Sequence, residues 1–189
     1  MIRLPGTFGI FVVISLISLS IYGQSNELTE IQTEQLPDDT AKVNRLISLG
    51  KKYCATNNRK ALYYLQESLY IANQLDYTSG VAWSYLWLGR VYYYMDEYDL
   101  ARRNLQKSKG LMEELNDAYG LAYYYFALGS ISNIRGNHVN ALKEFQEVVR
   151  FSRLAGDELM ESAGTFALGN IHLRRNKYTE AMRYRKKAR

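Results

Sequence analysis

Residues 81–105 read VAWSYLWLGRVYYYMDEYDLARRNL, and this stretch decides the fold. It holds two small-residue markers: a Leu-Gly pair at positions 88–89 and, further along, Ala101. Both markers recur in phase along the chain, as Leu49-Gly50, Leu88-Gly89, Leu128-Gly129 and Leu168-Gly169, and as Ala61, Ala101, Ala141 and Ala181. Two separate markers that stay in phase over four units predict an internal repeat with a period of about 40 residues.

Each unit is predicted to form two helices. In the second unit, Tyr85, Leu88 and Tyr92 have the i, i+3, i+7 spacing of one helical face. Residues 95–97 break this pattern, and a second helix is expected to follow and to run to about Leu115. Because the breaks between helices are short, neighbouring helices must lie antiparallel.

The four recurring glycines indicate close packing between helices. A glycine within a helix costs about 1 kcal/mol relative to alanine, so four of them at one phase require a compensating contact. They do not end the helices, because the apolar periodicity continues past each one. We expect the second helix of each unit to approach the first at the glycine, with the recurring alanine as the matching shallow position.

The markers resemble the tetratricopeptide repeat, whose signature is an aromatic residue, Leu-Gly, a second aromatic residue, alanine and a large apolar residue. The second unit matches this signature at Tyr85, Leu88, Gly89, Tyr92, Ala101 and Leu105. The third unit has Ser132 in place of the second aromatic residue and matches at Tyr125, Leu128, Gly129, Ala141 and Phe145. The first unit, one residue short in its turn, matches at Leu46, Leu49, Gly50, Tyr53 and Leu65. The fourth keeps Leu168, Gly169 and Ala181 but departs from the signature at Thr165, His172 and Arg185.

The resemblance implies an all-α fold, a right-handed superhelical solenoid of antiparallel helix pairs with about four repeats. It covers residues 39–189, divided into units at 39–77, 78–117, 118–157 and 158–189, the last of them incomplete. The units are longer than those of the common tetratricopeptide repeat and lack its usual proline, which is similar to the repeat regions of bacterial membrane signalling proteins. HEAT-type repeats share the unit length but lack the Leu-Gly and alanine markers.

The N-terminal residues are predicted to direct export. Arg3 is followed by an apolar run over residues 8–21, and the sequence becomes polar after Gly23. This pattern indicates a secretory signal peptide, residues 1–23, cleaved after Gly23; the alternative is an uncleaved N-terminal membrane anchor. Residues 24–38 are expected to form an acidic linker. The predicted location is therefore periplasmic, or membrane-anchored and facing the exterior.

In the family that the chain resembles, the first helix of each unit lines a concave groove that binds the partner. The positions that correspond to this groove are Asn44, Ile47, Lys51, Trp83, Leu86, Arg90, Tyr123, Phe126, Ser130, Ala163, Phe166 and Asn170. Aromatic rings with Lys51 and Arg90 at one edge suit an extended or helical peptide with some acidic character. The alternative is that several of these rings belong to the core between units. The carboxylate-clamp pattern of chaperone-binding members is incomplete, because Lys51 and Arg90 lack the paired asparagines.

The sequence offers no catalytic, metal-binding or cofactor site. Its only histidines, His138 and His172, lie in different units, and the single cysteine, Cys54, is distant from both. There is no phosphate-binding glycine loop and no nucleophile elbow. The stretch 174–189 holds eight basic residues and one acid and could contact nucleic acid or anionic lipid. A solvated helix face is the favoured interpretation, so no nucleic-acid partner is expected.

The leading hypothesis is a scaffold without enzymatic activity that binds a protein or peptide partner outside the cytoplasm. The alternative is the sensory region of a membrane signalling protein, such as a sensor histidine kinase, that ends before its effector domain. Two observations suggest this alternative. The units are long, and the last helix, expected over about 177–189, is shorter than its counterpart in the third unit. Membrane attachment is expected through the N-terminus or through a missing downstream segment. A hydrolase of cell-wall material is a third hypothesis, supported by the predicted location alone.

Overall fold

The computed structural model describes residue 30, residues 32–33 and residues 35–187. The chain divides into two compact units, residues 1–38 and residues 39–189. In the first unit, the backbone N–H of Leu36 donates to the carbonyl oxygen of Thr33 at 3.3 Å. The predicted signal peptide or anchor lies outside the described residues, as does much of the predicted acidic linker. Over the part of the chain that is described, no helix is long and apolar enough to cross a bilayer.

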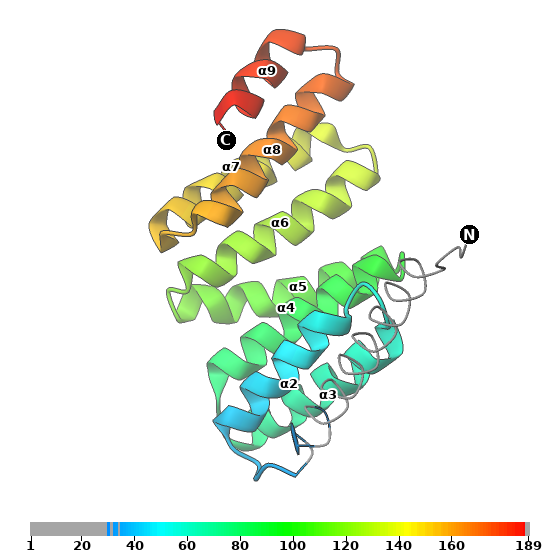
Figure 1. Ribbon diagram of the computed structural model, residues 1–189, viewed down its shortest axis with the longest axis vertical. Helices are drawn as coiled ribbons and strands as arrows, with labels where there is room; N and C mark the ends of the chain where they lie inside the picture. The colour runs from blue at the N-terminus through cyan, green and yellow to red at the C-terminus, as the bar shows by residue number, and fades with distance from the viewer. Residues whose placement is uncertain (1–29, 31, 34, 188–189) are drawn as a thin grey trace, which may run out of the picture. The chain divides into compact units, whose positions relative to one another are not determined.

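The second unit is all-helical over its described residues. Its helices are α2 (Thr40–Tyr53), α3 (Asn58–Gln74), α4 (Thr78–Tyr94), α5 (Tyr98–Glu114), α6 (Ala118–Ile134), α7 (His138–Ala155), α8 (Glu158–Arg174) and α9 (Tyr178–Lys187). They form four antiparallel hairpins, α2–α3, α4–α5, α6–α7 and α8–α9, stacked in chain order (Figure 1). The prediction of an all-α solenoid built from four helix pairs is confirmed.

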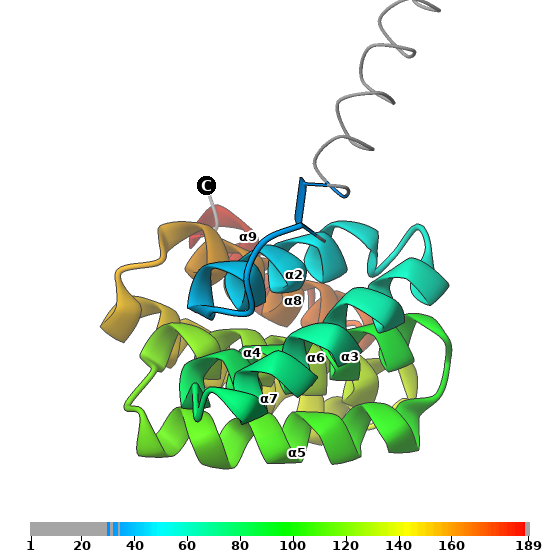
Figure 2. The same cartoon turned by 90° about the horizontal axis from the view of Figure 1, so that it is seen from below.

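The first helices of the hairpins form one continuous layer. Helix α2 contacts α4, α4 contacts α6, and α6 contacts α8. Among the described residues, by contrast, the Cα atoms of successive second helices do not come within 8 Å of one another. Successive hairpins are rotated relative to one another, as the view turned by 90° shows (Figure 2). One face of the first-helix layer therefore packs on the second helices, and the opposite face is free to line a groove.

The turns between helices recur at a regular interval along the chain. Six residues have a left-handed backbone, with φ between 51° and 74°: Asp76, Asp96, Asn116, Gly136, Gly156 and Asn176. In each turn the following N–H donates to a carbonyl five residues earlier, as Asp117 N donates to Met112 O at 2.9 Å, which closes the helix in a Schellman motif. Three of these following residues also cap the next helix through their side chains, namely Asp117, Asn137 and Asp157. From Asp76 onward, the turns therefore recur every 20 residues, so the second and third repeats each consist of two helix–turn modules of equal length.

The recurring glycines lie where the two helices of a hairpin approach closely. A Cβ atom on Gly89 would lie 2.7 Å from Cγ of Leu105 and 3.1 Å from the backbone oxygen of Ala101. The same contact recurs in the first and third hairpins, at Gly50 against Leu65 and at Gly129 against Phe145. The predicted close approach at glycine, with alanine opposite, is therefore confirmed, and it explains why the helix tolerates glycine at this phase.

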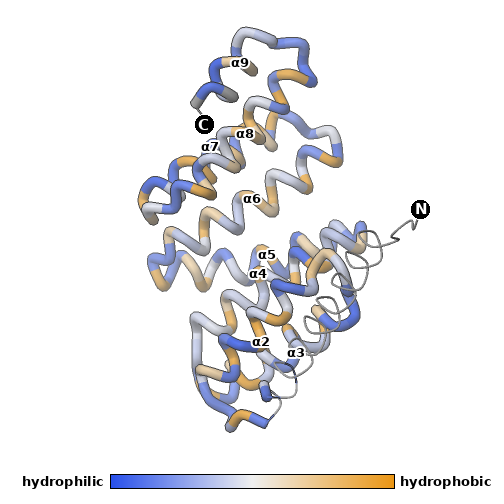
Figure 3. The backbone as a smooth tube through the Cα atoms, viewed as in Figure 1, coloured by the Kyte–Doolittle hydropathy of each residue, from blue (hydrophilic) through white to orange (hydrophobic). Residues whose placement is uncertain are grey.

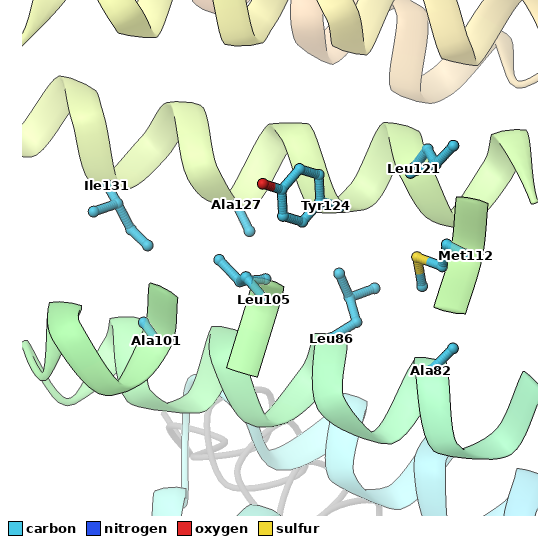
Figure 4. Packing of buried hydrophobic residues seen from close by; sticks show 9 residues of the cluster. All are labelled: Ala82, Leu86, Ala101, Leu105, Met112, Leu121, Tyr124, Ala127 and Ile131. Atoms are coloured by element: carbon cyan, nitrogen blue, oxygen red, sulfur yellow. The ribbon is translucent and has the colours of Figure 1, made fainter. Parts of the chain in front are cut away.

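The hairpins share a core instead of folding as separate units. One cluster of buried side chains joins α4, α5 and α6 (Figure 4), and its members are Ala82, Leu86, Ala101, Leu105, Met112, Leu121, Tyr124, Ala127 and Ile131. Burying a large apolar side chain contributes about 1.5–3 kcal/mol, so this cluster couples the second hairpin to the third. Apolar residues are spread along α6, which is packed on two sides, whereas α9 at the end of the stack is largely hydrophilic (Figure 3).

Candidate functional site

The free face of the first-helix layer carries three hollows that together form the groove. The N-terminal hollow, of about 310 Å³, is lined by Asn44, Ile47, Ser48, Lys51, Trp83, Trp87, Tyr119 and Tyr123. The central hollow, of about 100 Å³, is lined by Arg90, Tyr93, Tyr94, Phe126, Ala127 and Ser130. The C-terminal hollow, of about 300 Å³, is lined by Tyr93, Phe126, Ser130, Asn133, Ile134, Phe145, Ala163, Phe166, Ala167, Asn170 and Arg174. The last two hollows share residues, so they are continuous.

Aromatic rings from two helices build the wall of the N-terminal hollow. The Trp83 ring lies 5.5 Å from that of Tyr119 and 5.9 Å from that of Tyr123, between ring centroids. The Tyr119 hydroxyl donates a hydrogen bond to the Tyr123 hydroxyl oxygen at 3.1 Å. Burial raises the pKa of Tyr123, so its hydroxyl stays protonated at any physiological pH. The wall is therefore apolar with a hydroxyl donor at its edge.

Two cations lie on the ring of Trp87 in the floor of the groove. The Lys51 Nζ atom is 5.5 Å from the Trp87 ring centroid, and the Arg90 guanidinium carbon is 4.7 Å from it. Lys51 also lies 5.9 Å from the Tyr123 ring centroid. Trp87 itself is only 3% exposed, because it also belongs to the buried cluster that contains Leu65 and Val91. Cation–π contacts of this kind contribute about 0.5–2 kcal/mol and hold the charged groups in place.

The cations on Trp87 have no acidic partner within the described part of the chain. Ion pairs such as Lys109–Glu113, Arg135–Asp99, Arg150–Glu147 and Arg153–Glu161 involve no residue of the groove lining. Of the titratable groups that influence Tyr123, Asp157 is the only carboxylate, and its side chain caps α8 by accepting from the N–H of Met160. The floor of the groove thus carries two positive charges without a compensating negative one.

The C-terminal hollow has a different chemistry. Its walls are apolar, since Phe126 packs edge-on against Phe145 at 5.7 Å and Phe166 is 49% exposed. The Asn133 side-chain oxygen is buried and accepts no hydrogen bond, although a buried polar atom normally has a partner. Ser130 is already engaged, because its hydroxyl donates to the backbone oxygen of Phe126 at 2.8 Å. This hollow can accommodate an apolar side chain and offer an acceptor to a backbone N–H group.

The predicted groove positions distribute over the three hollows with one exception. Asn44, Ile47, Lys51, Trp83 and Tyr123 line the N-terminal hollow, whereas Arg90, Phe126, Ser130, Ala163, Phe166 and Asn170 line the other two. The placement of Leu86 in the groove is wrong, because this residue is 0% exposed and belongs to the cluster that contains Leu105 and Tyr124. The side chains at the corresponding positions 47, 126 and 166 do line the hollows.

Sequence reasoning missed several residues of the groove. Trp87 is the most important of them, and its signal was available, because a residue four positions after Trp83 lies on the same helical face. Tyr119 had the same signal, since it precedes Tyr123 by four positions. Nothing in the sequence indicates that Lys51 and Arg90 share one ring, because this contact depends on how α2 lies against α4.

Comparison with known families bears on the fold. A family model described as tetratricopeptide repeat matches residues 80–153. The chain carries tetratricopeptide repeats. The matched span covers the second and third hairpins, and the structure extends the same arrangement to the first and the last. Tetratricopeptide repeats are non-catalytic scaffolds that generally mediate protein–protein interactions.

One solved structure shares the arrangement over nearly the whole chain. It is a Signal Transduction ATPase with Numerous Domains (STAND) protein with a tetratricopeptide repeat sensor, from Pyrococcus horikoshii. The match has a TM-score of 0.70 and 18% sequence identity, and it covers 95% of this chain and 28% of that protein. The chain therefore spans less than a third of its structural relative, and the likeness is one of fold. A comparison with curated proteins gave no match.

Proposed function

We propose that the tetratricopeptide repeats of this chain bind a peptide segment of a partner protein in the groove, outside the cytoplasm. The observation that carries this proposal is the surface chemistry of the free face. Large side chains lie open there, as the exposed fractions of Tyr119 (41%) and Phe166 (49%) illustrate. An apolar surface of this kind, rimmed by polar groups, marks an interaction site.

Three further features favour a peptide over a flat protein surface. The hollows lie in a row along α4, α6 and α8, with the first reaching α2, which suits an elongated ligand. The buried oxygen of Asn133 lacks a donor that a peptide N–H would supply. The apolar walls of the C-terminal hollow would accept a single large side chain, which is the usual form of a binding anchor.

A peptide library displayed against the full chain tests this proposal. Peptides recovered from the library are expected to lose about tenfold or more in affinity when Trp83→Ala or Phe166→Ala is introduced, because buried aromatic anchors dominate such interfaces. The matched control is Tyr70→Ala on α3, an aromatic residue that is 62% exposed on a second helix. Equal losses for Tyr70→Ala and the groove variants would contradict a groove-based function.

The proposed location rests on the sequence of residues 1–23 and is tested separately. Cells of the natural source are fractionated, and the mass of the protein is measured. Export with cleavage predicts a product that lacks residues 1–23 and lies outside the cytoplasm. An intact N-terminus in the membrane fraction would identify the anchor instead, and an intact N-terminus in the cytoplasm would reject the proposed location.

A second candidate function is the sensory region of a membrane signalling protein. The observation that favours it is the structural match, in which the similar protein is described as having a tetratricopeptide repeat sensor and is much longer than this chain. On this hypothesis the natural product is membrane-bound and larger than the 21.9 kDa of the sequence. A natural product of the mass expected for the sequence, with or without residues 1–23, would exclude it.

A further inference from the structure

We propose that a hollow in the fourth repeat, formed where Thr165 takes the place of a large side chain, binds the aromatic ring of a tyrosine or phenylalanine presented by a partner protein. This Thr165 hollow has a volume of about 370 Å³. Its lining, among the described residues, consists of Gln146, Val149, Arg153, Glu161, Thr165, Leu168 and Tyr184. None of these side chains lines the three groove hollows, so a ring bound here would be recognised independently of the peptide proposed for the groove.

The Thr165 hollow lies on the side of α8 that faces away from the groove. At 3.6 residues per turn, Glu161, Thr165 and Leu168 fall on one stripe of this helix. Ala163 and Asn170, which line the C-terminal groove hollow, fall on the opposite stripe. The remaining described walls of the Thr165 hollow come from α7 and α9. A partner bound there would therefore not compete for space with a ligand in the groove.

Comparison of the repeats shows which group the hollow lacks. The position of Thr165 is occupied by Leu46, Tyr85 and Tyr125 in the first three units. Both tyrosines are half-buried, and the Tyr125 ring stacks on that of Phe151 with 5.5 Å between centroids and an interplanar angle of 12°. Thr165 is itself 5% exposed and reaches no further than its own helix, where its hydroxyl donates to a backbone oxygen at 2.8 Å. The fourth repeat thus lacks an aromatic ring at a position where the two middle repeats have one.

The surroundings of Tyr125 correspond to the walls of the Thr165 hollow. Burial raises the pKa of Tyr125, and Lys109 on the preceding second helix lowers it in part, so the lysine lies near the phenol. The counterpart of Lys109 one repeat later is Val149, which lines the hollow. The hollow is therefore the equivalent of the Tyr125 site without its ring, which is why we expect an aromatic side chain to fit it.

The inner walls of the hollow suit an aromatic ring. Val149 and Leu168 provide aliphatic surface, and the Tyr184 ring is held parallel to that of His172, with 5.2 Å between centroids and an interplanar angle of 11°. An engineered cavity of about 150 Å³ with apolar walls binds benzene, so the Thr165 hollow is large enough for one ring and the atoms that attach it to a partner. A single aromatic side chain inserted in a pocket is a frequent anchor of protein–protein interfaces.

The rim of the hollow is polar and partly fixed. The Arg153 Nε atom donates to the Glu161 carboxylate at 2.7 Å, which joins α7 to α8 beside the opening. Gln146 adds an exposed amide, which can both donate and accept a hydrogen bond. An apolar pocket with a polar rim of this kind suits a side chain that enters from a partner whose backbone stays at the surface.

The first test uses p-cresol, the side chain of tyrosine without its backbone, and NMR of the methyl groups of the full chain. A ring in the hollow should shift the methyl signals of Val149 and Leu168, with a dissociation constant on the order of 1 mM for so small a ligand. The methyl signals of Ile47, which lines the N-terminal groove hollow, report separately on any binding in the groove. An absence of shifts at Val149 and Leu168 would overturn the proposal.

Substitutions at two equivalent positions assign the shifts to the hollow. Thr165→Tyr restores the residue of the middle repeats and should abolish the shifts, because its own ring fills the space. Thr165→Ser keeps both the space and the hydroxyl and should bind p-cresol unchanged. Tyr125→Thr makes the converse change and should create a second site, reported by the methyl groups of Leu128. Shifts at Val149 and Leu168 that persist in Thr165→Tyr would contradict the assignment.

A peptide library tests whether a partner supplies the ring. It is displayed against Trp83→Ala, in which the groove is impaired, and against the same chain with Thr165→Tyr added. Peptides that bind only the first chain should be enriched in tyrosine and phenylalanine. If p-cresol binds but no peptide depends on Thr165, a free aromatic molecule is the ligand and the proposed protein contact is overturned. Failure at Thr165 leaves the groove function standing, because that function depends on Trp83 and Phe166.

Discussion

The two faces of the first helices differ in how much their residues vary from one repeat to the next. On the face that packs on the second helices, the same contact recurs in each of three hairpins, with Gly50, Gly89 and Gly129 against a large apolar side chain. On the groove face, one repeat position holds Asn44, Trp83, Tyr123 and Ala163 in succession. The repeated face builds the fold, whereas the face that changes from unit to unit distinguishes the ligand. Substitutions on the first face should therefore affect stability, and those on the second should affect binding.

The largest loss of stability should come from removing the large side chain that packs on the recurring glycine. Leu105→Ala removes a side chain that is 0% exposed and packs on Gly89, so we expect the free energy of unfolding to fall by about 2–5 kcal/mol. Phe166→Ala on the groove face should cost less than about 1 kcal/mol, because that ring is 49% exposed. Urea denaturation followed by circular dichroism measures both. Similar losses for the two variants would show that the groove face also holds the fold together.

A pair of glycine substitutions sharpens the comparison. Gly89→Ala places a Cβ atom 2.7 Å from Leu105 Cγ, and this overpacking should lower the free energy of unfolding by about 1–3 kcal/mol. Gly110→Ala makes the same change in α5, where no atom lies within 4 Å of the new Cβ, and should raise it by up to about 1 kcal/mol. The two variants differ only in the neighbour of the glycine, so effects of the same sign would refute the packing explanation.

Substitutions in a turn test whether the recurring left-handed residues also stabilise the fold. Gly136 has φ of +74° with no neighbour within 4 Å of a Cβ, so Gly136→Ala should lose about 1 kcal/mol through backbone strain alone. Gly136→Asn should lose less, because Asn116 and Asn176 occupy the equivalent turns. Thermal unfolding of the two variants, scanned side by side, measures this order. A larger loss for asparagine would argue against strain as the cause.

The smallest expected change in stability concerns Glu144, a half-buried residue whose position holds a different residue type in each of the first three units. Glu144 in α7 corresponds to Tyr64 and Asn104 in earlier units, and burial raises the pKa of its carboxyl, although Ser132 and Arg102 lower it in part. A raised pKa means that stability is highest while the carboxyl is protonated and declines as pH rises through the pKa of the folded state. Glu144→Gln should therefore be more stable than the unaltered chain at neutral pH.

The pH dependence supplies the control for this variant. Below about pH 4, near the ordinary pKa of glutamate, the carboxyl is neutral in both the folded and the unfolded chain. The stability advantage of Glu144→Gln should then vanish. Urea midpoints measured at several pH values check this, and an advantage that persists in acid would point to a cause other than charge burial.

The sequence predicted the repeated features well and the unrepeated ones poorly, for a physical reason. The helix pairs, the break at residues 95–97 and the close contact at the glycines are each encoded four times or nearly so, and the structure confirms them. The groove had to be inferred from single positions, where a shift of one residue turns a side chain by about 100°. That shift explains why Trp87 was missed and why Leu86 was misplaced.

Other features were beyond the reach of local patterns. The pairing of Lys51 and Arg90 on one ring requires α2 and α4 to be placed side by side, which spacing along the chain does not specify. The first turn, over residues 54–57, also differs from the others, because it has no left-handed residue. The visible sign of this difference was that the Leu-Gly pairs of the first two units, at 49–50 and 88–89, are closer in sequence than the later pairs.

The position of the two tryptophans gives the groove its own optical signal. Trp83 and Trp87 are the only tryptophans of the chain, and both line the N-terminal hollow. The tryptophan emission of the native protein therefore comes from this one site, without any attached dye. Trp87 is buried and Trp83 is only half-buried, so a soluble quencher such as acrylamide should quench the emission of Trp83 first and that of Trp87 second. A ligand that fills the hollow would protect Trp83 from the quencher. Occupancy of the hollow could therefore be followed by fluorescence quenching.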